Sequence, residues 1–129
     1  MNTKIFIVED NPDIREIYRL VFELAGFQVD ASENGLDAIS RLPEVRPDLI
    51  LLDIMLPEMD GFEVLKAVKQ NMADSGLQNI PIVVWSNLSQ EEDIQKAMSL
   101  GASYYLRKSD YDGDALVEKV KDILDKLGK

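Results

Sequence analysis

The chain alternates between short apolar runs and segments whose apolar residues recur at helical spacing. Short apolar runs bounded by turn residues are typical of strands buried in a parallel sheet. Five segments have this character: Ile5–Val8, Phe27–Ser32, 48–53, Ile82–Trp85 and Ser103–Arg107. The second is more polar than the others, which predicts a strand at the edge of the sheet. The pattern as a whole predicts five strands.

Helix signals lie between these strands. Asn11 can cap a first helix with Pro12 at its first position, and Gly26 is expected to end it. Asn34 is expected to open a second helix. Pro43 is expected to stop that helix, because proline has no amide hydrogen to donate.

Three further helices follow in the same way. Asp60–Gly61 leads into the third, and the stretch Asn71–Asn79 is predicted to be a rather long loop. Ser89, with Glu92 three residues later, has the spacing of a capping box for the fourth helix. Asp112 can cap the fifth.

Strands separated by helices imply βαβ crossovers and a parallel sheet that helices cover on both faces. We therefore predict an α/β fold, a flavodoxin-like doubly wound sheet of five parallel strands in the order 2-1-3-4-5, with five helices. Residues 1–129 are expected to form one domain. In this order the first and third strands are neighbours at the topological switch point, where open α/β sheets bind their ligands.

Carboxylates follow both of those strands. Asp53 closes the third strand, and Glu9 and Asp10 follow the first strand directly. Since the strands are parallel, the three acids are expected to converge at one edge of the sheet. Repulsion between their negative charges would destabilise this arrangement unless a cation binds there. Ser86 and Lys108 end the fourth and fifth strands at the same edge.

Composition narrows the chemistry of such a site. The chain has 24 acidic and 14 basic residues and a net charge of −10, which argues against direct binding to nucleic acid or to an anionic membrane. It contains neither cysteine nor histidine, which leaves oxygen ligands and favours a hard ion such as Mg²⁺. The N-terminus has no signal peptide, and no apolar run approaches the ~20 residues of a membrane span. We expect a cytoplasmic protein.

Taken in order along this α/β alternation, these residues resemble the receiver domain of two-component response regulators, of the chemotaxis-regulator type. The resemblance covers essentially the whole chain and includes the segment Leu-Pro-Glu-Met-Asp-Gly at 56–61. It implies roles for six residues: Asp53 as phosphoacceptor, Glu9 and Asp10 as the acidic pair, Ser86 as the hydroxyl residue, Lys108 as the lysine of the site, and Tyr105 as the switch aromatic.

The resemblance also implies a cofactor and partners. Mg²⁺ would be held by Asp10, Asp53 and the backbone carbonyl of Met55, with Glu9 acting through water. Any phosphohistidine donor must be another protein, a sensor histidine kinase or a phosphotransfer protein, because this chain has no histidine. The output is expected at the face of the fourth helix, fifth strand and fifth helix, toward an unknown target protein. Beyond self-phosphotransfer and autodephosphorylation, no enzymatic activity is expected.

The chain departs from the family pattern at two positions. Ser109 follows Lys108 where the family usually has proline, commonly with a cis bond. We expect a trans bond, because a cis bond before a non-proline residue costs about 2.5–4 kcal/mol. Asn87 is larger than the residue usual after the hydroxyl and narrows access to the phosphoryl group. No output domain follows the last helix, so the chain is either a single-domain regulator or an excised receiver.

Three other kinds of protein share parts of this pattern. An interaction module could keep the fold without cycling phosphate, but the complete set of site residues argues against it. A Mg²⁺-dependent phosphatase of the haloacid-dehalogenase type would need an aspartate two residues after the nucleophile, where Met55 stands. A flavin carrier would need a hydroxyl- or glycine-rich phosphate loop after the first strand, where Glu9 and Asp10 would repel phosphate instead.

Overall fold

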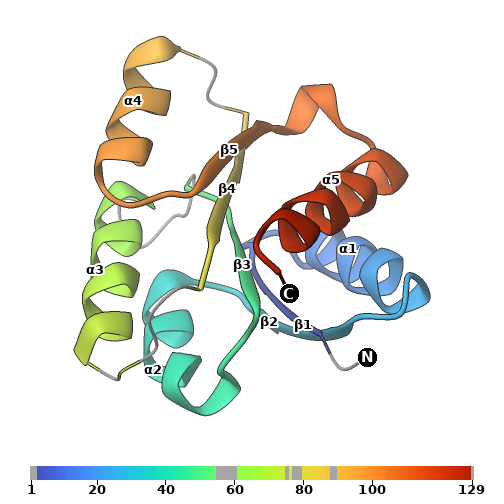
Figure 1. Cartoon of the computed structure of the whole chain (residues 1–129), viewed down its shortest axis with the longest axis horizontal. Coiled ribbons are helices and arrows are strands. Elements are labelled where there is room, and N and C mark those ends of the chain that lie inside the picture. The colour runs from blue at the N-terminus through green and yellow to red at the C-terminus, as the bar shows by residue number, and fades with distance from the viewer. Residues whose placement is uncertain (1–2, 55–60, 75, 77–79, 88–89, 129) are drawn as a thin grey trace.

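The computed structural model describes residues 3–54, 61–74, 76, 80–87 and 90–128. Strands and helices alternate along these residues (Figure 1). The strands are β1 Lys4–Val8, β2 Gln28–Ser32, β3 Leu49–Leu52, β4 Ile82–Ser86 and β5 Tyr104–Arg107. The α-helices are α1 Pro12–Leu24, α2 Gly35–Val45, α3 Gly61–Asp74, α4 Glu91–Ser99 and α5 Gly113–Lys126.

All strand pairs of the sheet are parallel, and the strand order is β2-β1-β3-β4-β5. The predicted fold class and strand order are therefore confirmed, with β2 at an edge. Val8 at the end of β1 is in register with Leu52 at the end of β3 and with Ser32 at the end of β2. The carboxyl ends of these three strands thus lie side by side.

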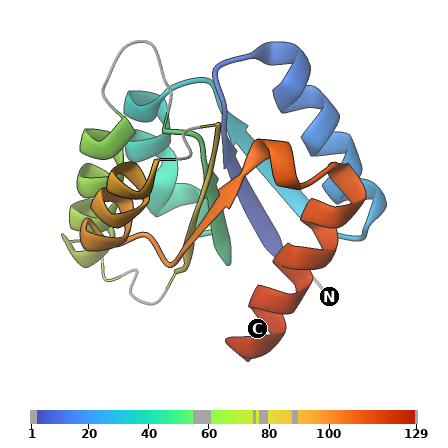
Figure 2. The same ribbon diagram turned by 90° about the horizontal axis from the view of Figure 1, so that it is seen from above.

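Helices cover both faces of the sheet, with α1 and α5 on one face and α2, α3 and α4 on the other (Figure 2). Because successive strand side chains point to opposite faces, each strand contributes to two cores. In β1, Phe6 and Val8 pack toward α2–α4, whereas Ile5 and Ile7 pack toward α1 and α5. This burial on both faces is why the central strands are apolar throughout.

The predicted helix caps at Asn11, Asn34 and Asp112 are confirmed. The Asn11 side chain accepts hydrogen bonds from the backbone amides of residues 13 and 14, and the Asn34 and Asp112 side chains each accept one from the residue three positions on. These bonds satisfy amides that the first helical turn leaves without a partner. They also fix where each helix leaves the edge of the sheet.

Two predicted helix ends are wrong. Helix α2 continues through Pro43 to Val45, and Arg46 ends it in the left-handed conformation with φ of 48°. Burial of Leu42 and Val45 in the core favours this last turn and offsets the loss of the backbone hydrogen bond that proline cannot donate. Helix α3 likewise continues to Asp74, so that residues 71–74 of the predicted loop are helical, with Met72 buried.

Differences also occur around α4 and after β5. Helix α4 has Gln90 at its cap position, without a side-chain cap, while the predicted cap Ser89 lies outside the described residues. Residues Lys108–Asp110 form a short 3₁₀ turn that the sequence pattern did not predict. The Lys108–Ser109 bond is trans, as predicted, since the described chain contains no cis peptide bond.

Candidate functional site

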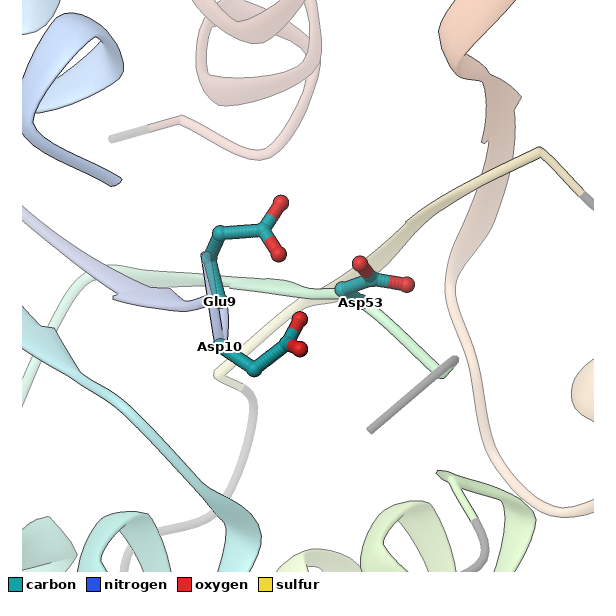
Figure 3. A group of neighbouring side chains, drawn as sticks. All are labelled: Glu9, Asp10 and Asp53. Atoms are coloured by element: carbon teal, nitrogen blue, oxygen red, sulfur yellow. The ribbon is translucent and has the colours of Figure 1, made fainter. Parts of the chain in front are cut away.

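Three carboxylates converge where β1 and β3 end. Backbone hydrogen bonds continue the sheet by one residue past each strand, from the Glu9 amide to the Ser32 carbonyl and from the Asp53 amide to the Val8 carbonyl, each 3.0 Å long. One carboxylate oxygen of each of Glu9, Asp10 and Asp53 lies within 4.8 Å of the others, and the side chains point toward one another (Figure 3). The structure therefore brings together the three acids that the sequence placed at this edge.

These acids differ in exposure. The residues Glu9 and Asp53 are only 3% and 4% exposed, whereas Asp10 is exposed to solvent. A charged carboxylate is costly to bury unless a cation or hydrogen-bond donors compensate it. The pocket thus has a buried part that needs such compensation and an open part that solvent reaches.

Lys108 supplies a cation to the buried part. Its ammonium Nζ donates hydrogen bonds to Glu9 Oε1 at 2.7 Å and to Asp53 Oδ2 at 2.9 Å. The Lys108 side chain starts in the 3₁₀ turn after β5 and is itself only 17% exposed. The site thus has one ammonium for three carboxyl groups, so its acidic side chains outnumber its basic ones.

The crowding shifts the pKa values of two of these groups. Burial is the largest cause that raises the pKa of Glu9, the hydrogen bond from Lys108 opposes it, and the Asp53 charge adds to it; together these effects raise the pKa of Glu9 to about 7. For Lys108, burial alone would lower the pKa, but the hydrogen bonds to Glu9 and Asp53 outweigh burial and raise it. Lys108 therefore stays charged at neutral pH, while Glu9 lies near its midpoint.

Arg15 is a supporting residue that the sequence analysis did not single out. Its guanidinium Nη1 donates a hydrogen bond to the backbone carbonyl of Glu9 at 2.9 Å and a longer one to that of Asp10 at 3.4 Å. These bonds tie the first turn of α1 to the acidic pair. The sequence does contain a signal for this role. Helix α1 follows two acidic residues, and Arg15 lies about one turn into that helix.

Ser86 and Tyr105 lie next to the acidic cluster. Ser86 ends β4 and is fully buried, and the half-buried Tyr105 side chain lies close enough to it that the Ser86 hydroxyl lowers the pKa of the phenol. The Tyr105 ring packs against the core beneath α2–α4, and burial raises the pKa of its phenol. The Tyr105 ring is therefore partly buried beside Ser86.

The remaining predicted site residue is Met55, whose carbonyl lies outside the described residues, as does most of the 56–61 segment. Asn87, which was expected to narrow access to the site, is exposed to solvent. No helix in the described part of the chain is both long and apolar enough to cross a membrane.

The parallel strand order β2-β1-β3-β4-β5 with helices on both faces defines the flavodoxin-like class of doubly wound α/β folds. The family model of the response regulator receiver domain matches residues 5–121. The chain belongs to this family of two-component response regulators.

Several relatives and solved structures are similar to the chain. Sporulation initiation phosphotransferase F of Bacillus subtilis is 37% identical, over 96% of this chain and 95% of its own length. Response regulator SaeR of Staphylococcus aureus is 33% identical over 98% of this chain, which spans only 53% of that protein. The structure of chemotaxis protein CheY4 from Vibrio cholerae superposes with a TM-score of 0.86 at 27% identity, covering 96% of this chain and all of that one.

The raised pKa of Glu9 predicts a pH dependence of stability in metal-free protein. Between pH 4.5 and about 7 the folded chain holds a proton on Glu9 that the unfolded chain releases. The contribution of Glu9 to the free energy of unfolding is therefore greatest below pH 4.5 and is lost as the pH rises through about 7.

Urea denaturation in EDTA at a series of pH values across this range should show that the free energy of unfolding of wild type falls as the pH rises. In Glu9→Gln the free energy of unfolding should fall less steeply with pH. Glu23→Gln changes an exposed glutamate of α1 and should keep the wild-type slope. Equal slopes in Glu9→Gln and wild type would contradict the assignment of the proton to Glu9.

Proposed function

We propose that this chain is a phosphorylation-controlled switch that accepts a phosphoryl group on Asp53 from a partner phosphohistidine. One observation carries the proposal, namely that the buried Asp53 carboxylate is hydrogen bonded to Lys108 beside a second buried acid. A carboxylate held by an ammonium is positioned to attack phosphorus while the ammonium neutralises charge on the phosphoryl oxygens.

In the transfer, an Asp53 oxygen forms a bond to phosphorus as the bond from phosphorus to the donor imidazole nitrogen breaks. The imidazole keeps the electron pair, and Asp53 becomes an acyl phosphate. Such a reaction requires positioning and charge neutralisation more than covalent chemistry from the protein. Lys108 would neutralise one phosphoryl oxygen, and Ser86 would donate a hydrogen bond to another.

The three acids also fit a magnesium site. Carboxylate oxygens that lie within 4.8 Å of one another suit the oxygen coordination that Mg²⁺ prefers. We propose that Asp10, Asp53 and the Met55 carbonyl hold the ion, with Glu9 acting through water. When bound, Mg²⁺ would supply positive charge to the phosphoryl oxygens and to the acidic cluster.

The donor must be another protein, since the chain contains no histidine. Similar proteins are named as a sporulation phosphotransferase and as a response regulator, which supports a histidine kinase or a phosphotransfer protein as the donor. A downstream protein would then recognise the phosphorylated form.

We propose that Ser86 and Tyr105 link the phosphoryl group to an output face of α4, β5 and α5. The Ser86 hydroxyl lies close to the Tyr105 phenol, so movement of Ser86 toward a phosphoryl oxygen would change the contacts of the Tyr105 ring. Phosphorylation would then favour one position of this ring over another.

The first prediction of this proposal concerns the phosphorylated residue. Incubation with Mg²⁺ and acetyl phosphate should add one phosphoryl group, measured by intact mass, that is labile to alkali and hydroxylamine. Asp53→Asn should not be labelled, because an amide is a poor nucleophile. An unlabelled wild-type chain would favour the non-cycling interaction module, and a stable label on serine or tyrosine would refute the mechanism.

A second prediction concerns the metal. For an assumed dissociation constant of ~1 mM, 10 mM Mg²⁺ should add about 1.4 kcal/mol to the free energy of unfolding. Asp10→Ala should raise the melting temperature in EDTA, because it removes like charge from the cluster, and should abolish the Mg²⁺ effect. The control Asp13→Ala removes an exposed acid of the first turn of α1 and should leave that effect unchanged. Asp10→Ala no more stable than wild type in EDTA would contradict the repulsion.

A third prediction concerns the link to the output face. Ser86→Ala and Tyr105→Phe each remove one hydroxyl of the pair. Both variants should still be labelled on Asp53. In wild type a beryllofluoride mimic should slow amide exchange in α4 and β5, and in both variants this slowing should be smaller. Responses confined to residues 26–45 in the wild-type chain would show that the output face lies elsewhere.

A further inference from the structure

Three aromatic side chains meet on the face of the sheet that α1 and α5 cover. Trp85 of β4 is at the centre, and its neighbours are Tyr18 of α1 and Tyr111, which lies between the 3₁₀ turn and α5. The ring centroids of Trp85 and Tyr18 lie 5.6 Å apart at an interplanar angle of 80°, and those of Trp85 and Tyr111 lie 6.4 Å apart at 60°. Edge-to-face and tilted pairs at these distances are favourable contacts. We call these three residues the aromatic cluster.

Trp85 gives the aromatic cluster a fixed base. It is only 2% exposed and lies one position before Ser86 in β4. In the sheet it is in register with Leu106 of β5, two residues before Lys108. A large ring that is closely packed on a central strand has little room to move. A side chain that packs on Trp85 is therefore held at a defined position relative to the ends of β4 and β5.

The backbone that carries Lys108 is a single 3₁₀ turn, Lys108–Asp110. Such turns have poorer hydrogen-bond geometry than an α-helix, so this one depends on what it packs against. The ion pair between Arg107 and Asp110, at 3.7 Å, joins two exposed side chains and contributes little. Tyr111 follows the turn directly, and its contact with Trp85 ties the end of the turn to β4.

The placement of this turn decides where the Lys108 ammonium lies. Its two short hydrogen bonds, to Glu9 and to Asp53, are made at the end of a flexible four-carbon stem. A stem with many rotamers reaches both acids at once only if the backbone at its base stays in place. A shift of about 1 Å in a group that takes part in a reaction can slow the reaction about a hundredfold.

Tyr18 indicates how close the aromatic cluster lies to the acidic site. Burial raises the pKa of its phenol, the charge of Lys108 opposes that rise, and the charge of Glu9 adds to it. Rings beside an ion pair also exclude water, which strengthens the attraction between an ammonium and a carboxylate. The aromatic cluster therefore lies beside the pair of Lys108 and Glu9 as well as against the turn.

We propose that Tyr111 and Trp85 are positioning residues for Lys108. Their rings hold the 3₁₀ turn against β4, so that the ammonium stays on the Asp53 carboxylate and is in place for the phosphoryl group. Tyr18 supports the Trp85 ring from α1. The consequence for phosphotransfer rests on the function proposed above, whereas the placement of Lys108 does not, and the test measures the two separately.

The first measurement is made on the Lys108 ammonium itself. In proton–nitrogen correlation spectra, an ammonium held by two short hydrogen bonds exchanges its protons slowly with water and gives a resolved signal. Lys108→Met should remove this signal, which assigns it. Tyr111→Ala should broaden it beyond detection, because the turn is released. Tyr111→Phe should keep it, since the ring and not the hydroxyl makes the contact with Trp85.

The second measurement is the rate at which acetyl phosphate and Mg²⁺ label Asp53, at a temperature where every variant is folded. Tyr111→Ala should slow labelling about tenfold or more, and Tyr111→Phe should be labelled as fast as wild type. Lys108→Met should also slow labelling. Adding Tyr111→Ala to Lys108→Met should cause no further loss, because a residue that acts only through Lys108 then has nothing left to position.

Tyr104→Ala is the matched control. Tyr104 is a half-buried tyrosine that packs against the same core as Tyr111, but it begins β5, whereas Lys108 follows the end of that strand. The variant removes a comparable ring and should lower the melting temperature, as Tyr111→Ala does. It should keep both the ammonium signal and the wild-type labelling rate.

Three outcomes would overturn the proposal. One is a wild-type ammonium signal in Tyr111→Ala, another is a loss of labelling that multiplies when Tyr111→Ala and Lys108→Met are combined, and the third is an equal loss of the signal in Tyr104→Ala. A wild-type chain that acetyl phosphate does not label would refute the phosphotransfer instead. The ammonium signal would then still decide whether the rings place Lys108.

Discussion

Two carboxylates buried side by side are tolerated only when a positive charge compensates them, and in this chain Lys108 provides it. Its ammonium lies 2.7 Å from Glu9 and 2.9 Å from Asp53. The strand order and the position of Lys108 after β5 make this contact possible. The order β2-β1-β3-β4-β5 makes the ends of β1 and β3 neighbours, and a long side chain from beyond β5 reaches the carboxylates across the end of β4. Removing one partner of such a buried pair leaves an uncompensated charge, which is more costly than the pair itself.

The compensation is incomplete, and this gives the site its chemical character. The site has one ammonium for three carboxyl groups, the pKa of Glu9 is raised to about 7, mainly by burial, and Lys108 remains charged. Because carboxyl groups outnumber ammonium groups at this site, binding of a divalent cation there should be favourable. In the proposed cycle, the phosphoryl group would then redistribute the contacts of Lys108 and Ser86. Ser86 lies close to Tyr105, and the Tyr105 ring packs against the core under α4, so a change at Ser86 would reach that core through one side chain.

The two edges of the sheet offer different surfaces. At the carboxyl edge Lys108 binds two buried carboxylates and Arg15 binds the backbone carbonyls of the acidic pair, so the geometry of this edge is tightly constrained. The opposite edge carries a groove between α1 and α5, which is apolar at its walls and acidic around them. Helix α1 contributes to both, with Arg15 near its start and Leu24 at its end.

The sequence by itself determined the elements and the residues of the site, because apolar runs, helix caps such as Asn11 and the carboxylates after β1 and β3 are local signals. It was wrong where tertiary burial outweighs local propensity, as in the turn of α2 beyond Pro43 and in residues 71–74 of α3. Only the tertiary structure decided which acids Lys108 pairs with, because those contacts span 99 and 55 residues of chain. The same holds for the hydrogen bonds of Arg15 and for the groove, since both depend on how α1 lies against its neighbours, which the spacing of residues along one helix does not specify.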